Sequence, residues 1–168
     1  MLPSFIWVII MRILAFDQST NLTGWAVFDD DKYVDSGVID RHAIKDIDKR
    51  VAVMGLDICK KIKEYKPDAV IIEGIQKQSN TRTVIYLARL QGCVILYCAS
   101  KGIDLKILHP SEWRRVLSYN QGPKIKREEL KQQSRDYIKD VLGLSIKSED
   151  EVEAVCINVA ANKLYNTK

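Results

Sequence analysis

Histidine and paired cysteine, the residues from which zinc sites are commonly built, are scarce in this sequence. Its 168 residues include two histidines and four cysteines, and no two cysteines follow the CxxC spacing. A structural zinc site needs four such ligands at characteristic spacings, so the sequence argues against one. Each cysteine instead stands among apolar residues, which predicts buried, reduced thiols suited to a reducing cytosol, at Cys59, Cys93, Cys98 and Cys156.

Internal repeats, low-complexity tracts and an interdomain linker are also missing from the chain. A length of 168 residues and a hydrophobic content of 46% suit one globular domain with a real core. The formal net charge is only +4, which permits a nucleic-acid partner without requiring one. Composition is therefore that of an ordinary globular protein, and the function has to be inferred from the motifs.

The first ten residues, MLPSFIWVII, are apolar, but they have neither a basic region nor a small-residue cleavage site. A secretory signal peptide needs both, and the stretch is too short to span a membrane. We interpret residues 1–10 as an extension before a start at Met11, and residues 11–168 as a single domain. The alternative is that the extension lengthens the first strand or covers a sheet edge.

Hydrophobic periodicity predicts an ordered series of strands and helices. Strands are expected at residues 12–16, 24–28 and 33–39, as an antiparallel meander, and at 69–73 and 105–108. Helices are expected at residues 43–65 and 81–101, from Pro110 through SEWRRVL, and at 125–142 and 149–164. This order is typical of an α/β domain in which helices flank a mixed five-stranded sheet of one three-strand meander and two parallel strands.

Single carboxylates end two of the expected strands. Asp17 follows the apolar run ILAF, and Glu73 follows the fully apolar run AVII. If these strands are neighbours and run parallel, both side chains leave the sheet at the same edge. Open α/β sheets place their chemistry at that edge.

Acidic residues also gather at the start of the last expected helix, SEDEVEAVCINVAANKL. Ser148 as N-cap with Glu151 three residues later forms a capping box, and first-turn acids such as Glu149 complement the helix dipole. This explanation covers Glu153 less well, because it lies past the first turn and leads into an almost wholly apolar segment. Asp150 shares its face of the helix, so we expect both acids to point into the structure or at a cleft.

Four carboxylates from three elements therefore form a candidate metal site, namely Asp17, Glu73, Asp150 and Glu153. Unpaired buried carboxylates are costly, and a divalent cation would remove that cost. All-oxygen ligands suit Mg²⁺ or Mn²⁺ rather than zinc. We expect two Mg²⁺ ions, with Mn²⁺ as a substitute, bridged by Asp17 and used to hydrolyse a phosphodiester. For any one acid alone, pairing with a surface lysine is the simpler interpretation.

Three motifs resemble those of RuvC-type Holliday junction resolvases, within the ribonuclease H-like nuclease superfamily: ILAFDQSTNLTGWAVF, DAVIIEGI and SEDEVEAVCI. The resemblance covers most of the chain after Met11, and the motifs agree in order and spacing. It implies a ribonuclease H-like fold and a Mg²⁺-dependent endonuclease that resolves four-way junctions and other branched DNA. It further implies a homodimer in the cytoplasm of a bacterial or phage-infected cell. Its catalytic carboxylates correspond here to Asp17, Glu73, Asp150 and Glu153, the last being Glu where Asp is more usual.

The resemblance also implies a basic DNA-binding segment, to which NQGPKIKREELKQQ (120–133) corresponds loosely. Lys124, Lys126 and Arg127 would contact phosphates, and Lys126 would approach the scissile phosphate as a further catalytic residue. The simpler interpretation is a solvated helix start. An aromatic residue that often follows the glutamate motif is absent from GIQKQSN, so junction opening is expected either to use Gln76, Gln78 or Tyr86 or to work by a different means. Arg82 is a further candidate DNA contact.

Three other interpretations are open on the sequence alone. DQSTNLTGWAVFD also resembles the first phosphate loop of sugar kinases of the actin-like fold. Those kinases need a second domain and a second phosphate motif, for which this chain is too short. The other two are a ribosomal-RNA-processing nuclease of the RuvC-like group and a non-catalytic nucleic-acid-binding module. The last would lose no Mg²⁺-dependent property when one of the four acids is replaced.

Overall fold

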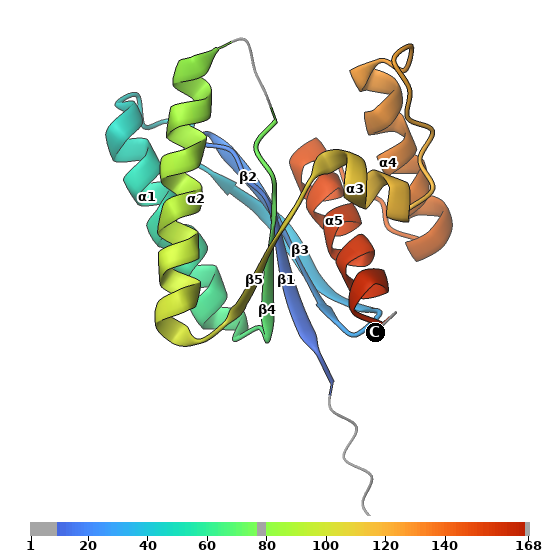
Figure 1. The fold of residues 1–168 in the computed structure, drawn as a ribbon, viewed down its shortest axis with the longest axis horizontal. Helices are drawn as coiled ribbons and strands as arrows, with labels where there is room; N and C mark the ends of the chain where they lie inside the picture. The colour runs from blue at the N-terminus through green and yellow to red at the C-terminus, as the bar shows by residue number, and fades with distance from the viewer. Residues whose placement is uncertain (1–9, 77–79, 167–168) are drawn as a thin grey trace, which may run out of the picture.

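A five-stranded mixed sheet forms the centre of the protein in this computed structural model, which describes residues 10–76 and 80–166 (Figure 1). The strands lie in the order β3-β2-β1-β4-β5. Their bounds are β1 Arg12–Asp17, β2 Leu22–Asp29, β3 Lys32–Asp40, β4 Ala69–Glu73 and β5 Asp104–Leu108. The first three strands pair antiparallel, whereas β1 with β4 and β4 with β5 pair parallel. The predicted meander plus two parallel strands is confirmed.

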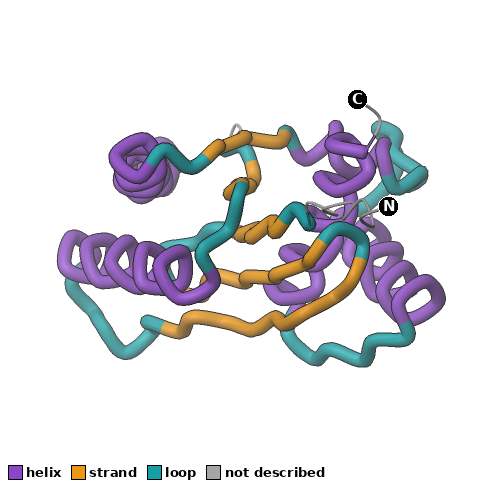
Figure 2. Tube along the Cα trace, turned by 90° about the horizontal axis from the view of Figure 1, so that it is seen from below, coloured by secondary structure: helices purple, strands orange, loops and turns teal. Residues whose placement is uncertain are grey.

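Helices cover both faces of the sheet, as Figure 2 shows in a view from below. The helices are α1 Ile47–Tyr65, α2 Thr81–Lys101, α3 Pro110–Val116, α4 Arg127–Leu142 and α5 Glu149–Asn166. Side chains of β1 alternate between two cores, with Leu14 and Phe16 facing α1 and α2, and Ile13 and Ala15 facing α5. The strand reads as continuously apolar because both of its faces are buried.

Two helix starts differ from the predicted boundaries. The helix expected from residue 43 begins at Ile47, because the Asp46 carboxylate caps it by accepting a hydrogen bond from the Lys49 amide at 2.7 Å. Ile44, which fits the helical period, therefore lies in the preceding turn. Similarly, α4 begins at Arg127 rather than at residue 125.

Helix α5 is fixed on the sheet by a buried polar contact. The Asn158 side-chain amide donates to the backbone carbonyls of Ile13 at 2.9 Å and of Ala26 at 2.8 Å. Asn162 donates in turn to Asn158 Oδ1 at 2.8 Å. Since a buried amide without partners would be costly, these bonds select one register of α5 against β1 and β2.

The first turn of α5 lies directly against β2 at Gly24. A Cβ atom added to Gly24 would stand 1.9 Å from the backbone oxygen of Asp150, so only glycine allows this approach. Gly24 is also the ladder partner of Asp17 at the end of β1. The contact therefore places the start of α5 beside the end of β1.

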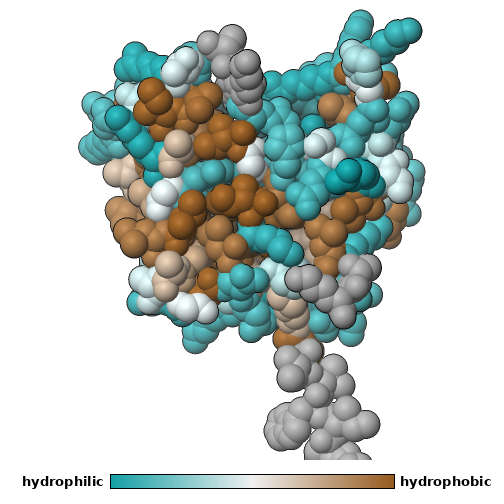
Figure 3. All heavy atoms as spheres, viewed as in Figure 1, coloured by the Kyte–Doolittle hydropathy of each residue, from teal (hydrophilic) through white to brown (hydrophobic). Residues whose placement is uncertain are grey.

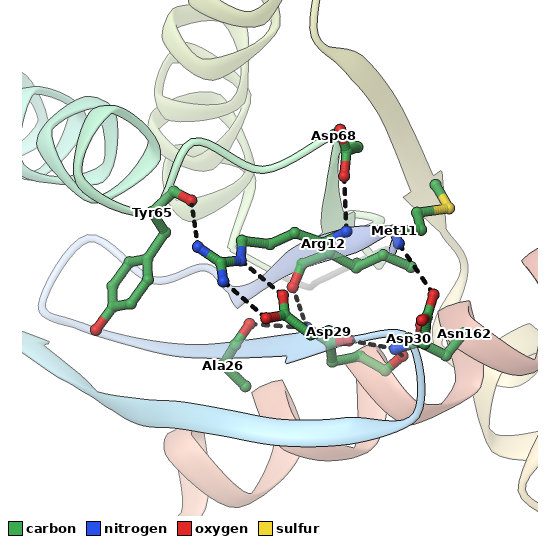
Figure 4. A network of polar contacts seen from close by, with 10 residues as sticks. Met11, Arg12, Ala26, Asp29, Asp30, Tyr65, Asp68 and Asn162 are labelled. Carbon is green, nitrogen blue, oxygen red and sulfur yellow. Dashed lines mark hydrogen bonds and ion pairs between the residues drawn. The ribbon is translucent and has the colours of Figure 1, made fainter. Parts of the chain in front are cut away.

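The opposite end of β1 carries a network of paired charges (Figure 4). The Arg12 guanidinium contacts both oxygens of Asp29, at 2.6 and 2.7 Å, and donates to the Tyr65 carbonyl at 3.2 Å. The backbone amide of Arg12 donates to Asp68 at 2.7 Å. These bonds join β1, β2 and the segment that follows α1.

Two of the four cysteines are less buried than the sequence predicted. Cys98 and Cys156 are buried as expected, but Cys93 is exposed on α2 and Cys59 is partly exposed. The prediction was wrong for Cys93 because α2 is apolar on its outer face too, with Ile85, Ile95 and Leu96 exposed, whereas Cys59 lies on α1. By length and composition alone α2 could cross a membrane, which is weak support for a span, and its inner face packs on α1 and the sheet.

The proposed extension at residues 1–10 lies outside the described residues except for Ile10.

Candidate active site

Three of the four predicted carboxylates converge at the carboxyl edge of the sheet. Asp17 ends β1, Glu73 ends β4, and Glu153 lies near the start of α5. One carboxylate oxygen of each residue lies within 4.8 Å of the others. The parallel pairing of Phe16 with Ile72 brings the two strand ends together, as the apolar runs before them predicted.

Asp150 lies on the wall of the same cavity, but it is not part of this three-residue cluster. Its negative charge nevertheless acts on the cluster, since it helps to raise the pKa of Asp17. The structure therefore separates the four predicted acids into three that converge and one beside them.

The four carboxylates form no ion pair with a basic side chain in the part of the chain that the structure describes. The neighbouring Glu149 provides the contrast, because it pairs with Lys131 at 2.6 Å and with Arg135 at 2.8 Å. Acids at the head of one helix thus fall into a paired and an unpaired group.

Glu151 belongs to neither group. As predicted, the Ser148 hydroxyl accepts from the Glu151 amide, at 3.4 Å. The Glu151 side chain does not return to Ser148, however, and accepts instead from the Ser36 hydroxyl on β3 at 2.6 Å. The capping box is therefore only half formed, and the Glu151 carboxylate ties α5 to the sheet.

Burial and mutual repulsion make the converging carboxylates hard to ionise together. Burial, reinforced by the charges of Glu73 and Glu153, holds the pKa of Asp17 well above its usual range. Burial also raises the pKa of Glu73 to about 7, against the opposing effect of its hydrogen bond from Trp113. The pKa of Glu153 is raised as well, mainly by burial. Bringing a divalent cation to these oxygens would relieve the repulsion, and the all-oxygen donor set fits Mg²⁺ or Mn²⁺.

Glu73 is held in place by two side chains that the sequence did not single out. Trp113 of α3, which is fully buried, donates from Nε1 to Glu73 Oε1 at 2.8 Å. Gln91 of α2 donates to the backbone carbonyl of Glu73 at 2.7 Å. One oxygen of the carboxylate is thereby oriented while the residue faces the cavity.

Two basic residues of the site were also missed. Arg114 and Lys131 line the cavity, and the charge of Arg114 lowers the pKa values of Asp17, Glu73 and Glu153. The available signal was the run WRR in α3, which carries two adjacent arginines after a buried tryptophan. Whether these arginines reach the site depends on the position of α3 beside the end of β4, and the sequence does not give that position.

The cavity has a volume of about 1050 Å³, far more than a pair of metal ions requires. Of the predicted DNA contacts, Gln76, Arg82 and Arg127 line it, and so does Tyr86, which is only 8% exposed. Lys124 and Lys126 are exposed just before α4 and do not line the cavity. Gln78 lies outside the described residues.

The polar segment after Asp17 closes a tight turn. The Thr23 hydroxyl donates to the Ser19 carbonyl at 2.8 Å and accepts from the Ser19 amide at 3.2 Å. The Ser19 hydroxyl accepts from the Asn21 amide at 3.2 Å. These hydroxyls are therefore engaged in shaping the loop between β1 and β2.

Comparison with known proteins identifies the family. The family model described as crossover junction endodeoxyribonuclease RuvC matches residues 13–161. This chain belongs to the RuvC family. Family membership confirms the predicted resolvase type and activity, a junction-resolving endonuclease, and decides against a phosphotransferase. The RuvC family depends on divalent metal, in agreement with the acidic cluster.

Curated RuvC relatives match most of the chain at modest identity. RuvC of Caldicellulosiruptor saccharolyticus is 24% identical over 155 residues, which cover 88% of this chain and 89% of the relative. RuvC of Borrelia turicatae is 29% identical over 113 residues, 65% of this chain and 70% of the relative.

Solved structures confirm the ribonuclease H-like fold of the RuvC family. Thermus thermophilus RuvC in complex with Holliday junction substrate matches with a TM-score of 0.73 at 14% identity, covering 93% of this chain and 96% of that one. Fowlpox virus resolvase in complex with substrate Holliday junction DNA matches with a TM-score of 0.63 at 16% identity, covering 92% and 99%.

Proposed function

We propose that this RuvC-family chain cuts four-way DNA junctions, and other branched DNA, with Asp17, Glu73, Asp150 and Glu153 holding two Mg²⁺ ions that Mn²⁺ can replace. One observation carries the proposal. Three carboxylates that form no ion pair among the described residues converge within 4.8 Å in a member of a family of junction-resolving endonucleases.

The chemistry is hydrolysis of a phosphodiester without a covalent enzyme intermediate. Bound Mg²⁺ would supply Lewis-acid activation of the attacking water and stabilisation of the leaving oxygen. Asp17 and Glu73 stand on strand ends, and Trp113 fixes the orientation of Glu73, so these ligands are held before substrate arrives. Arg114 contributes positive charge beside the acids, which favours entry of a phosphate into an otherwise anionic site.

The α4 side of the cavity is the proposed path of the DNA backbone. Arg127 and Lys131 line the cavity there, and Lys124 and Lys126 are exposed just before α4. We expect replacement of Lys124 and Lys126 together by alanine to flatten the slope of log affinity against log salt by about 0.9 per lost contact. A salt titration of junction binding in Ca²⁺, which should permit binding without cutting, measures this. An unchanged slope would place both lysines on the solvent side, and a slower cut by Lys126→Ala at saturating protein would support its catalytic role.

A homodimer is the proposed assembly, because two copies can nick two strands related by the near two-fold symmetry of a junction. The outer face of α2 suits a second copy. Ile85, Ile95 and Leu96 are 45%, 42% and 71% exposed there, and apolar surface gathers over α2 in Figure 3. Sedimentation should give a dimer for the wild type and a monomer for Leu96→Glu. A monomeric wild type at micromolar concentration would contradict this assembly, which is proposed to act in the cytoplasm of a bacterial or phage-infected cell.

The activity itself is tested on labelled four-way junction, fork, linear duplex and structured RNA, with and without Mg²⁺. The proposal predicts Mg²⁺-dependent cutting of the junction, weaker cutting of the fork, and intact linear duplex and RNA. Asp17→Asn should abolish cutting but retain junction binding, and Asp31→Asn, at an exposed position outside the cavity, serves as the matched control. Preferential cutting of RNA would favour the ribosomal-RNA nuclease, and junction binding without any cutting would favour a non-catalytic module.

A further inference from the structure

Buried polar atoms without partners are concentrated in one place. In the described part of the chain, the buried side-chain nitrogen and oxygen atoms that have no hydrogen-bond partner are Gln18 Nε2 and Oε1, Arg50 Nε and Arg114 Nε. All three residues line the cavity of the acid cluster. Because buried polar groups are normally hydrogen-bonded, this concentration points to partners from outside the chain, either a ligand or ordered water.

Arg114 stands with the acids, but Gln18 and Arg50 belong to a different wall. Gln18 directly follows Asp17, and Arg50 lies near the start of α1, where its Nη1 donates to the Ile44 carbonyl at 2.9 Å. Helix α1 and helix α4, which carries Arg127 and Lys131, lie on opposite sides of the sheet (Figure 1). The acid cluster therefore has basic groups on two sides, and from the sequence we expected the basic segment before α4 and, on α2, Arg82.

The unpaired atoms of this second wall have the chemistry of an anion site. Arg50 Nε and Gln18 Nε2 are donors, and Arg50 carries a permanent positive charge. Arg50 forms no ion pair with a carboxylate among the residues that the structure describes. Arg89, on neighbouring α2, is different, because it pairs with Asp48 at 3.0 Å and does not line the cavity. A partly buried arginine with a buried, unpartnered Nε and no carboxylate partner is suited to bind a phosphate.

We infer that Gln18 and Arg50 form a second phosphate site, which holds a phosphodiester of the cut strand on the α1 side of the scissile bond. The inference rests on the proposed function. It gives the cut strand a direction, across the acid cluster from Arg127 on α4 to Arg50 on α1. The remaining acceptor, Gln18 Oε1, is buried and also lacks a partner, and a turn of the side chain toward that phosphate would let it accept from a sugar hydroxyl, a base or an ordered water.

The test compares Arg50→Gln with Arg89→Gln, which remove the same charge from inside and outside the cavity. Junction binding is measured in Ca²⁺ over a range of salt concentrations, with thermal unfolding as the check on folding. Arg50→Gln should weaken binding about tenfold and lower the salt slope by about 0.9, whereas Arg89→Gln should change neither.

A methylphosphonate scan then locates the contact. Neutralising single phosphates of the cut strand should weaken wild-type binding at one position beside the scissile bond, and Arg50→Gln should lose nothing further at that position. Gln18→Ala leaves α1 unchanged, and its binding should likewise not weaken further when the phosphate at that position is neutralised. If the wild type binds junctions but Arg50→Gln matches Arg89→Gln, or no phosphate shows the coupling, the second phosphate site is wrong and the proposed function stands. If the wild type neither binds nor cuts junctions, the proposed function fails and this site with it.

Discussion

The two ends of β1 carry charge in opposite ways. At the Arg12 end, a guanidinium meets the Asp29 carboxylate at two points and Asp68 binds the backbone, so each charge has a partner (Figure 4). At the Asp17 end, carboxylates from β1, β4 and α5 lie within 4.8 Å of one another, and none of them forms an ion pair with a described residue. Balanced charge serves the fold, whereas charge left unbalanced at a cost to the fold indicates a ligand.

The largest difference is expected between two acids in the first turns of α5, one in the unpaired cluster and one bound to Ser36. Glu153→Gln should reduce junction cutting at least about a hundredfold, because it removes a cluster ligand. Glu151→Gln should leave cutting within a few fold, because Glu151 only anchors α5 to Ser36. Single-turnover cleavage at saturating Mg²⁺ measures both. Equal losses, or a larger loss for Glu151→Gln, would mean that the unpaired acid has been wrongly chosen.

Gly24→Ala tests whether the cluster depends on backbone approach. The new Cβ would meet the Asp150 carbonyl at 1.9 Å, so the start of α5 must move away from β1. We expect cutting to fall at least about tenfold and the Mn²⁺ concentration for half-maximal activity to rise. Gly92→Ala is the matched control, since a Cβ there has nothing within 4 Å. Unchanged Mn²⁺ dependence in folded Gly24→Ala would show that the contact does not position the acids.

The pH dependence of stability tests the unbalanced end without any substrate. A carboxyl whose pKa is higher in the folded than in the unfolded chain binds extra protons on folding, so its contribution is lost as pH rises. For Glu73 this window extends from about 4.5 to about 7. In EDTA, Glu73→Gln should therefore match the wild type near pH 4.5 and exceed it at pH 8, by on the order of 2 kcal/mol. Urea unfolding at several pH values measures the difference, and a pH-independent difference would contradict the assignment.

At the Arg12 end of β1, removing a charge should destabilise the protein rather than stabilise it. Arg12→Met should lower the free energy of unfolding by about 1 kcal/mol, because it leaves Asp29 unpaired at a partly exposed site. Cutting by the folded variant should be unchanged, since Arg12 is at the far end of β1. A cutting defect in folded Arg12→Met would break the division between the two ends.

The fold was predictable because its signals are local. Buried strands such as 69–73 are continuous apolar runs, and α2 has its predicted bounds of 81–101. The start of α1 was missed, because Ile44 fits the helical period while Asp46 provides the cap. The exposure of Cys93 was missed because an apolar outer face looks like a buried one in sequence.

The candidate site was predictable where it depends on strand ends and on helix spacing. Asp17, Glu73 and Glu153 were found from the apolar segments that carry them. Trp113, Arg114 and Arg50 were not, because their relation to the acids arises only when α3 and α1 pack beside the sheet edge. Long-range contacts of that kind leave no period or motif in the sequence.

The central claim is that the Asp17 end of β1 is left unbalanced for a divalent cation. Thermal unfolding of the wild type and of Asp17→Asn, each in EDTA and in Mg²⁺ or Mn²⁺, tests it most directly. The account predicts that the cation raises the melting temperature of the wild type but not of Asp17→Asn, and that Asp17→Asn is the more stable protein in EDTA. The same cation response in both proteins, or a less stable Asp17→Asn in EDTA, would contradict it.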